Sequence, residues 1–185
     1  MVYYPQYGLL YNPEQNVART KTVTLNFKRS EIVDDLKNYA FVIGDILKTQ
    51  DEHDRHQIQD IGEDGNIDRV TRVMNLCMAE CREVLFPYTK EDVEDTESRT
   101  NTLTEVKEYN IEMLVPDDFS NTTVTLLEQL IHEFIVARIM ADWMSITNKA
   151  EEPTWREKAE DAMTKIKRCK SSRTGKVRRK QHPFP

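Results

Sequence analysis

One long apolar segment, from Ser120 to about Thr147, constrains the fold more than any other part of the chain. If this segment is helical, apolar side chains cover most of its circumference, and Ser120 or Asn121 provides the N-cap. Such a helix must be covered on most sides, so it lies either in the middle of a helical bundle or at an interface between subunits. Charged residues such as Glu128 and Arg138 interrupt the run, which is therefore no candidate for a membrane span.

Three other segments show apolar residues at helical spacing. They cover roughly residues 31–48, a stretch from Asp68 to Pro87, and a stretch that opens at Pro153 and ends near residue 169. In the first of them, either Tyr39 or Ala40 continues the apolar face. The acidic stretches 49–68 and 88–104 lack this spacing and are predicted to be loops.

Two short segments alternate between apolar and polar residues, as half-buried strands do. They are Thr22–Phe27 and the run from Tyr109 to Val115, which Pro116 ends. Pairing of the two across the long sequence separation is one arrangement that fits. The predicted fold is therefore mainly α: a bundle of about four helices with a small two-stranded β element and extended N- and C-terminal arms. Residues 1–20 form the first arm, 21–169 the body and 170–185 a basic tail.

The N-terminal arm is rich in tyrosine. Two prolines, Pro5 and Pro13, exclude a helix there. Tyrosine buries a large area at a low cost in side-chain entropy, so an extended arm of this kind is suited to docking. The arm packs either on its own body or, as we expect, on a neighbouring subunit. The tyrosines predicted to make this subunit contact are Tyr3, Tyr4, Tyr7 and Tyr11.

Charge is divided unevenly along the chain. Every acidic residue precedes Lys165, and nine lysines and arginines follow from there to the end. Residues 1–164 hold the other 17 of the 26 basic residues and all 32 acidic ones, so this part carries −15 against +9 for the end. The residues predicted to contact a subunit or DNA are Lys170, Arg173, Lys176, Arg178, Arg179, Lys180 and Phe184.

Three interpretations fit the basic tail. It is a solvated terminus, or it binds the phosphate backbone of duplex DNA, or it lies on the acidic body of an adjacent subunit. No aromatic residue is interleaved among its charges for base stacking, which disfavours the reading of bases. We expect the contact between subunits, with Phe184 as an apolar anchor at the far end, and keep DNA contact as the alternative.

The chain offers no recognisable catalytic motif, so we expect no enzymatic activity, no cofactor and no metal site. His53 and His56 lie in an acidic cluster without a second cluster to complete a metal site. The acids of residues 60–68 lack the order of an EF-hand. His132 and Glu133 lack the second helical histidine of a zinc protease. Asp142 and Trp143 are predicted to fix helix packing, and the three cysteines to be reduced core or half-buried thiols.

Two runs of residues resemble a known family. They are the long segment Leu127–Asn148, which ends in an Asp-Trp motif at Asp142 and Trp143, and the segment from Trp155 to Ala162 with its spaced alanines. Together with the arginine-rich end, they are similar to small structural proteins encoded in the head–tail gene modules of tailed phages and prophages. The similarity extends over about residues 20–185.

The resemblance implies a neck protein, of the head-completion or connector type. Such a protein forms a homo-oligomeric ring of about twelve copies between the portal and the tail, with extended termini that contact neighbouring subunits. Portal and tail proteins would be its partners, and the neck of the virion, assembled in the host cytoplasm, its location. An acidic lumen would let DNA pass without binding it. The alternative hypothesis is a DNA-associated accessory protein that binds duplex backbone through its basic tail.

Overall fold

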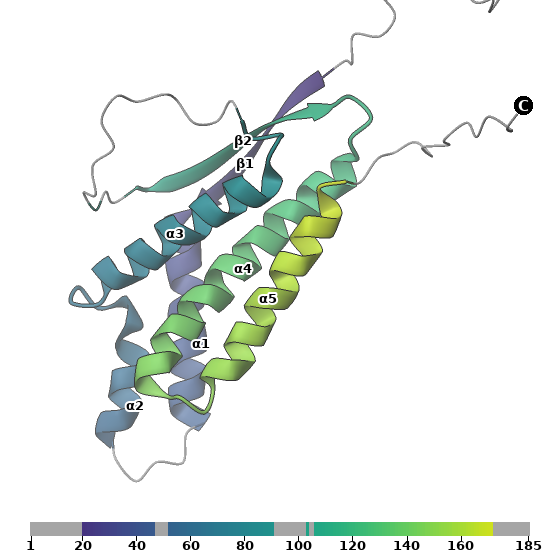
Figure 1. The fold of residues 1–185 in the computed structure, drawn as a ribbon. Coiled ribbons are helices and arrows are strands. Elements are labelled where there is room, and N and C mark those ends of the chain that lie inside the picture. The colour runs from purple at the N-terminus through teal and green to yellow at the C-terminus, as the bar shows by residue number, and fades with distance from the viewer. Residues whose placement is uncertain (1–19, 47–51, 91–102, 104–105, 172–185) are drawn as a thin grey trace, which may run out of the picture.

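The fold is mainly α with one small antiparallel sheet, as the sequence predicts. The computed structural model describes residues 20–46, 52–90, 103 and 106–171. In chain order, the elements are β1 (Thr20–Lys28), α1 (Arg29–Ile46), α2 (Glu52–Gln59), a 3₁₀ turn (Asp60–Gly62), α3 (Ile67–Leu85), β2 (Glu108–Pro116), α4 (Asn121–Thr147) and α5 (Glu152–Cys169). The sheet lies at one end of an elongated helical body, and α5 ends near the sheet (Figure 1).

α4 is the central helix of this body. It packs along α5 and also contacts α1, α2, α3 and β1. Thirteen of its residues are buried, from Thr123 to Met144. Its first turn is capped by Ser120, whose Oγ accepts the backbone N–H of Thr123 at 3.4 Å. Of the two places predicted for this helix, the structure shows the middle of a bundle. Among the described residues, neither α4 nor any other helix has the length and hydropathy to cross a membrane.

The two strands pair with one another, although about eighty residues separate them in sequence. They run antiparallel, with Leu25 opposite Ile111 and Phe27 opposite Tyr109. These four side chains are buried and join the core formed by the helices. The sheet therefore closes one end of the bundle by burying the apolar face of each strand, as the alternation predicts.

The prediction of a loop over residues 49–68 is wrong for its middle part. Residues 52–62 form α2 and the 3₁₀ turn, so that the described part of the chain has five α-helices rather than about four. Ile58 and Ile61 are buried, and two isolated apolar residues leave no periodicity to recognise in so polar a stretch. Gly44 of α1 allows the close approach, since a Cβ there would lie 3.0 Å from Cγ of Gln59. Most of the second predicted loop, 91–102, lies outside the described residues.

Candidate functional site

The end of α4 carries two side chains that fasten other elements to the bundle. Both oxygens of Asp142 accept hydrogen bonds from the guanidinium of Arg69 on α3, at 2.7 and 3.1 Å. The indole N–H of Trp143 donates to the backbone oxygen of Ile58 on α2, at 2.9 Å. The Asp-Trp motif thus holds α2 and α3 against the central helix. This is the packing role expected from the sequence.

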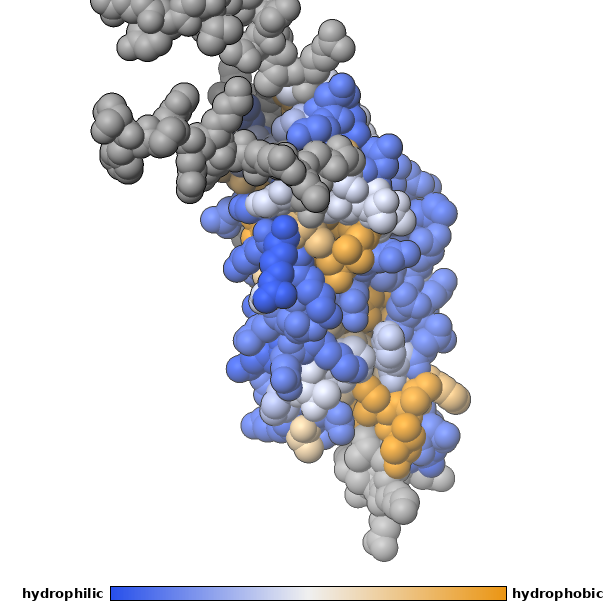
Figure 2. All heavy atoms as spheres, turned by 90° about the vertical axis from the view of Figure 1, so that its right-hand side faces the viewer, coloured by the Kyte–Doolittle hydropathy of each residue, from blue (hydrophilic) through white to orange (hydrophobic). Residues whose placement is uncertain are grey.

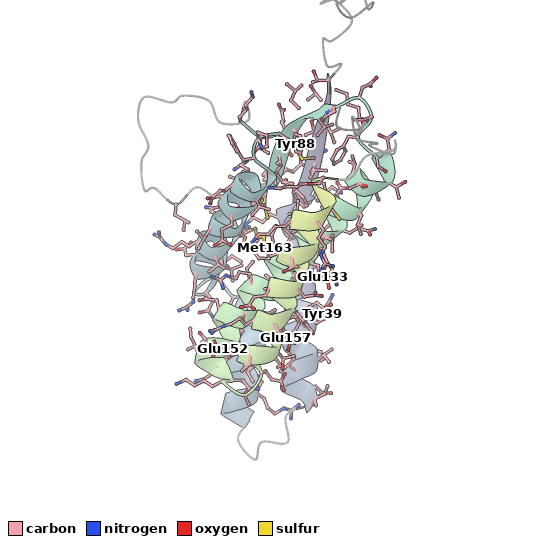
Figure 3. All side chains as sticks on the ribbon, turned by 45° about the vertical axis from the view of Figure 1, so that its right-hand side comes forward. Tyr39, Tyr88, Glu133, Glu152, Glu157 and Met163 are labelled. Carbon is pink, nitrogen blue, oxygen red and sulfur yellow. The ribbon has the colours of Figure 1, made fainter. Side chains whose placement is uncertain are left out.

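A groove runs between α1 and α5 with α4 as its floor. It holds a cavity of about 260 Å³, and we call it the α1–α5 groove; it is lined by Asp35, Tyr39, His132, Glu133, Val136, Ala137, Trp155 and Lys158. The rings of Tyr39 and Trp155 meet edge to face at 5.1 Å, and Lys158 Nζ lies 4.0 Å from the centre of the Trp155 ring. Figure 3 shows Tyr39 and Glu133 on the flank of α5 that faces α1, with Met163 on the opposite flank.

A polar contact joins the floor of the α1–α5 groove to its α1 side. His132 Nε2 of α4 lies 2.8 Å from Asp35 Oδ2 of α1. No group of three or more potential metal ligands occurs in the described ranges, and His132 and Glu133 belong to no such cluster. The groove therefore combines aromatic surface with side chains of both charges.

The second half of α1 exposes an apolar face. Tyr39, Val42 and Ile46, which we call the α1 stripe, follow one another at helical spacing and are 47%, 52% and 71% exposed. The space-filling view shows hydrophobic surface gathered toward the end of the body that lies opposite the sheet (Figure 2). Single exposed apolar residues are ordinary, whereas a continuous patch marks a surface that a partner covers.

The two outer edges of the sheet differ in their hydrogen bonding. The backbone N–H of Leu114 donates outward to the oxygen of Tyr88 at 2.8 Å, and Arg82 donates to the outward oxygen of Asn110 at 2.8 Å. The outer edge of β2 is therefore occupied by the end of α3 and the turn after it. Leu114 and Asn110 stand opposite Thr22 and Asn26 of β1, and in an antiparallel pair such opposite residues both turn their backbone groups outward. Because this direction alternates along a strand, the backbone groups of Val23 and Leu25 between them bond to β2.

The alternate residues of β1 consequently point away from β2. They are Thr22, Thr24 and Asn26, and their side chains are exposed. Within the described part of the chain, no hydrogen bond reaches the outward N–H and C=O groups of these three residues. An open edge of this kind is a template for another strand.

Of the residues predicted to contact a subunit or DNA, the structure describes Lys170. Its Nζ donates to the backbone oxygen of Val84 at 3.1 Å, which ties the end of α5 to the end of α3 within one chain. The remaining predicted contacts lie outside the described residues; they are Tyr3, Tyr4, Tyr7, Tyr11, Arg173, Lys176, Arg178, Arg179, Lys180 and Phe184.

The cysteines are free thiols, as predicted. Cys77 and Cys81 are buried on α3 and Cys169 is half-buried at the end of α5. Burial raises the pKa of Cys77 far above its usual range and raises that of Cys81 to about 12. Both thiols therefore stay protonated at neutral pH and are poor nucleophiles and poor metal ligands.

We expect the free energy of unfolding to fall as the pH rises from about 9 toward about 12. In the unfolded chain the thiol of Cys81 ionises near its ordinary pKa of 9.0, whereas in the folded chain it ionises at about 12. The unfolded state therefore loses protons first, and this part of the stability, present below pH 9, is lost as the pH passes through the folded pKa. Urea titrations across this range, with a Cys77→Ala/Cys81→Ala variant as control, measure the effect. An equal loss in the variant would contradict this assignment.

Sequence reasoning missed both open surfaces. For the α1 stripe a signal exists: Val42 and Ile46 fall outside the repeat of Ile32, Leu36 and Ala40, so α1 has more apolar residues than its buried face needs. For the edge of β1 no local signal exists. Thr22, Thr24 and Asn26 are polar residues typical of the solvent-exposed face of a strand, whether or not the strand lies at the edge of its sheet. Which edge is covered depends on where the end of α3 packs.

Comparisons of the chain with models of protein families, with curated proteins and with solved structures find no match in any of the three.

Proposed function

We propose that the chain is a structural protein of a tailed-phage neck, which forms a homo-oligomeric ring between portal and tail and lets DNA pass. The runs that resemble such proteins coincide with α4 and α5. These two helices pack along one another at the centre of the bundle. The Asp-Trp motif at the end of α4 acts there as a structural anchor, which supports a role in architecture rather than in catalysis.

The observation that carries the proposal is that the protein has a well-packed hydrophobic core and, in addition, apolar side chains and strand backbone groups that no described residue covers. Large side chains from every helix and both strands are buried in one cluster. Nevertheless, the α1 stripe leaves apolar area in solvent, and the outer edge of β1 leaves backbone groups without protein partners among the described residues. A subunit designed to be covered by its neighbours has these properties.

The charge distribution supports the same assembly. The basic end of one subunit is attracted to the acidic body of the next, since residues 1–164 carry −15 and the remainder +9. Asp60, Glu63 and Asp64 are exposed at the turn that leads into α3. Acidic groups of this kind, facing a ring lumen, repel phosphate and leave DNA free to slide.

Mass measurement of the chain mixed with candidate portal and tail proteins tests the proposal. We expect a closed oligomer to form on the portal or tail template, and we expect the chain to be present in purified particles. A chain that stays monomeric with every candidate partner and is absent from particles would refute the proposed function.

A salt series of DNA binding tests the alternative of an accessory DNA-binding protein. Nine cations at the end of the chain predict an affinity that falls steeply with salt if they hold phosphates. Tight binding of duplex DNA that is lost when residues 170–185 are deleted, without ring formation, would favour that alternative over the neck protein.

A further inference from the structure

We propose that the outer edge of β1 binds residues 6–12 of a second copy of the chain as an added β-strand. This rests on the homo-oligomer proposed above, and it names the surface on which the N-terminal residues of one subunit bind the next. The strand addition would extend the two-stranded sheet to three strands in every subunit.

The acceptor is a long and regular edge. β1 spans nine residues without proline or glycine, about 30 Å of strand. The outward backbone groups of Thr22, Thr24 and Asn26 have no hydrogen-bond partner among the residues that the structure describes. Natural proteins protect such edges. Here Tyr88 and Arg82 cover the outer edge of β2, and no residue of the described ranges covers the outer edge of β1. The asymmetry indicates that β1 is kept free for a partner.

The donor has the composition and the length of a strand. Residues 6–12 read Gln-Tyr-Gly-Leu-Leu-Tyr-Asn, and Pro5 and Pro13 bound them on both sides. In extended form, Tyr7, Leu9 and Tyr11 share one face. That face would continue the apolar face of β1, where Val23 is only partly buried, and cover it.

Charge favours this segment over the basic end of the chain. Lys21 and Lys28 stand near the two ends of β1. Five cations lie between Arg173 and Lys180, and a strand formed by them would place like charges side by side. Residues 6–12 carry no charge, so they meet no such repulsion.

The connection between donor and β1 favours a second copy over the same chain. Residues 13–19 form a connection of seven residues, whereas hairpin loops usually have about two to five. In extended form these seven residues span about 23 Å, enough to reach an adjacent subunit.

Amide hydrogen exchange of the full chain, at low and at high protein concentration, tests the inference. We expect Thr22, Thr24 and Asn26 to exchange at least tenfold more slowly at high concentration. Val23 and Leu25, which already bond to β2, should show little change. Free exchange of the three outward amides at both concentrations would overturn the inference, and so would equal protection at both, because the edge would then be covered within one chain.

Two variants identify the edge and the segment. Thr24→Pro removes an N–H that points away from β2, so it keeps the original sheet and blocks the added strand. Leu9→Pro breaks the donor, and Gln15→Pro in the connection is its matched control. We expect the first two to abolish the concentration-dependent protection and the control to retain it. Protection that survives Leu9→Pro would overturn the choice of donor.

The outcomes separate this inference from the proposed function. A ring that forms with portal or tail proteins while the outward amides of β1 exchange freely would overturn the inference and leave the neck function standing. Concentration-dependent protection of these amides in a chain that forms no ring with any partner would refute the neck function and leave the strand addition standing.

Discussion

Replacing Trp143 with alanine is expected to lower the free energy of unfolding by about 3–5 kcal/mol. The indole is 6% exposed and lies at the end of the central helix. Its removal leaves a cavity between α4 and α2, and it also leaves the buried oxygen of Ile58 without its donor. Urea denaturation followed by circular dichroism measures the change.

Trp143→Phe separates the two contributions. Phenylalanine keeps most of the buried ring and loses only the N–H, so we expect a smaller loss of about 1–3 kcal/mol. A loss as large as that of the alanine variant would show that the hydrogen bond to Ile58 outweighs the packing. A loss below about 1 kcal/mol for Trp143→Ala would contradict the role of the Asp-Trp motif as a structural anchor.

Deletion of residues 172–185 is expected to abolish assembly of the subunits while the body keeps its stability. The deletion removes five of the nine cations of the basic end and Phe184. It retains α5, which ends at Cys169, and Lys170 with its bond to Val84. Because the expected attraction is between charges, assembly of the full chain should also weaken as salt is raised and the screening length shortens. Sedimentation and urea denaturation measure the two quantities.

Two milder variants show which part of the tail acts. One replaces Arg173, Lys176, Arg178, Arg179 and Lys180 with glutamine, and the other is Phe184→Ala. We expect the first to remove the salt dependence and most of the assembly, and the second to weaken assembly at every salt concentration. Assembly that is unchanged by both variants and by the deletion would rule out the tail as a contact between subunits.

Local signals sufficed for most of the fold. The apolar circumference of α4, the N-cap at Ser120 and the proline at the start of α5 each depend on residues within one segment, and each appears in the structure as predicted. The sequence did not predict α2, because this helix is stabilised by its contacts with other elements rather than by a pattern within its own residues. The burial of Ile58 and the close approach to Gly44 both depend on distant elements.

The outer edge of β1 and the α1 stripe were harder to predict, because each depends on which neighbouring elements fail to cover it. The apolar face of β1 follows from the alternation in its sequence. That its outer edge has no hydrogen-bonding partner in the described part of the chain follows from the end of α3, which bonds to β2 instead. Likewise, Val42 and Ile46 have the composition of core residues, and their exposure follows from the side of α1 that faces α4. Tertiary arrangement decides both.

Electron microscopy of the chain assembled with its portal or tail partners tests the central claim most directly. The account predicts a closed ring between portal and tail, built from copies of this helical body, with an open channel along its axis. Particles whose neck is complete without density for this chain, together with a chain that stays monomeric beside every partner, would contradict it.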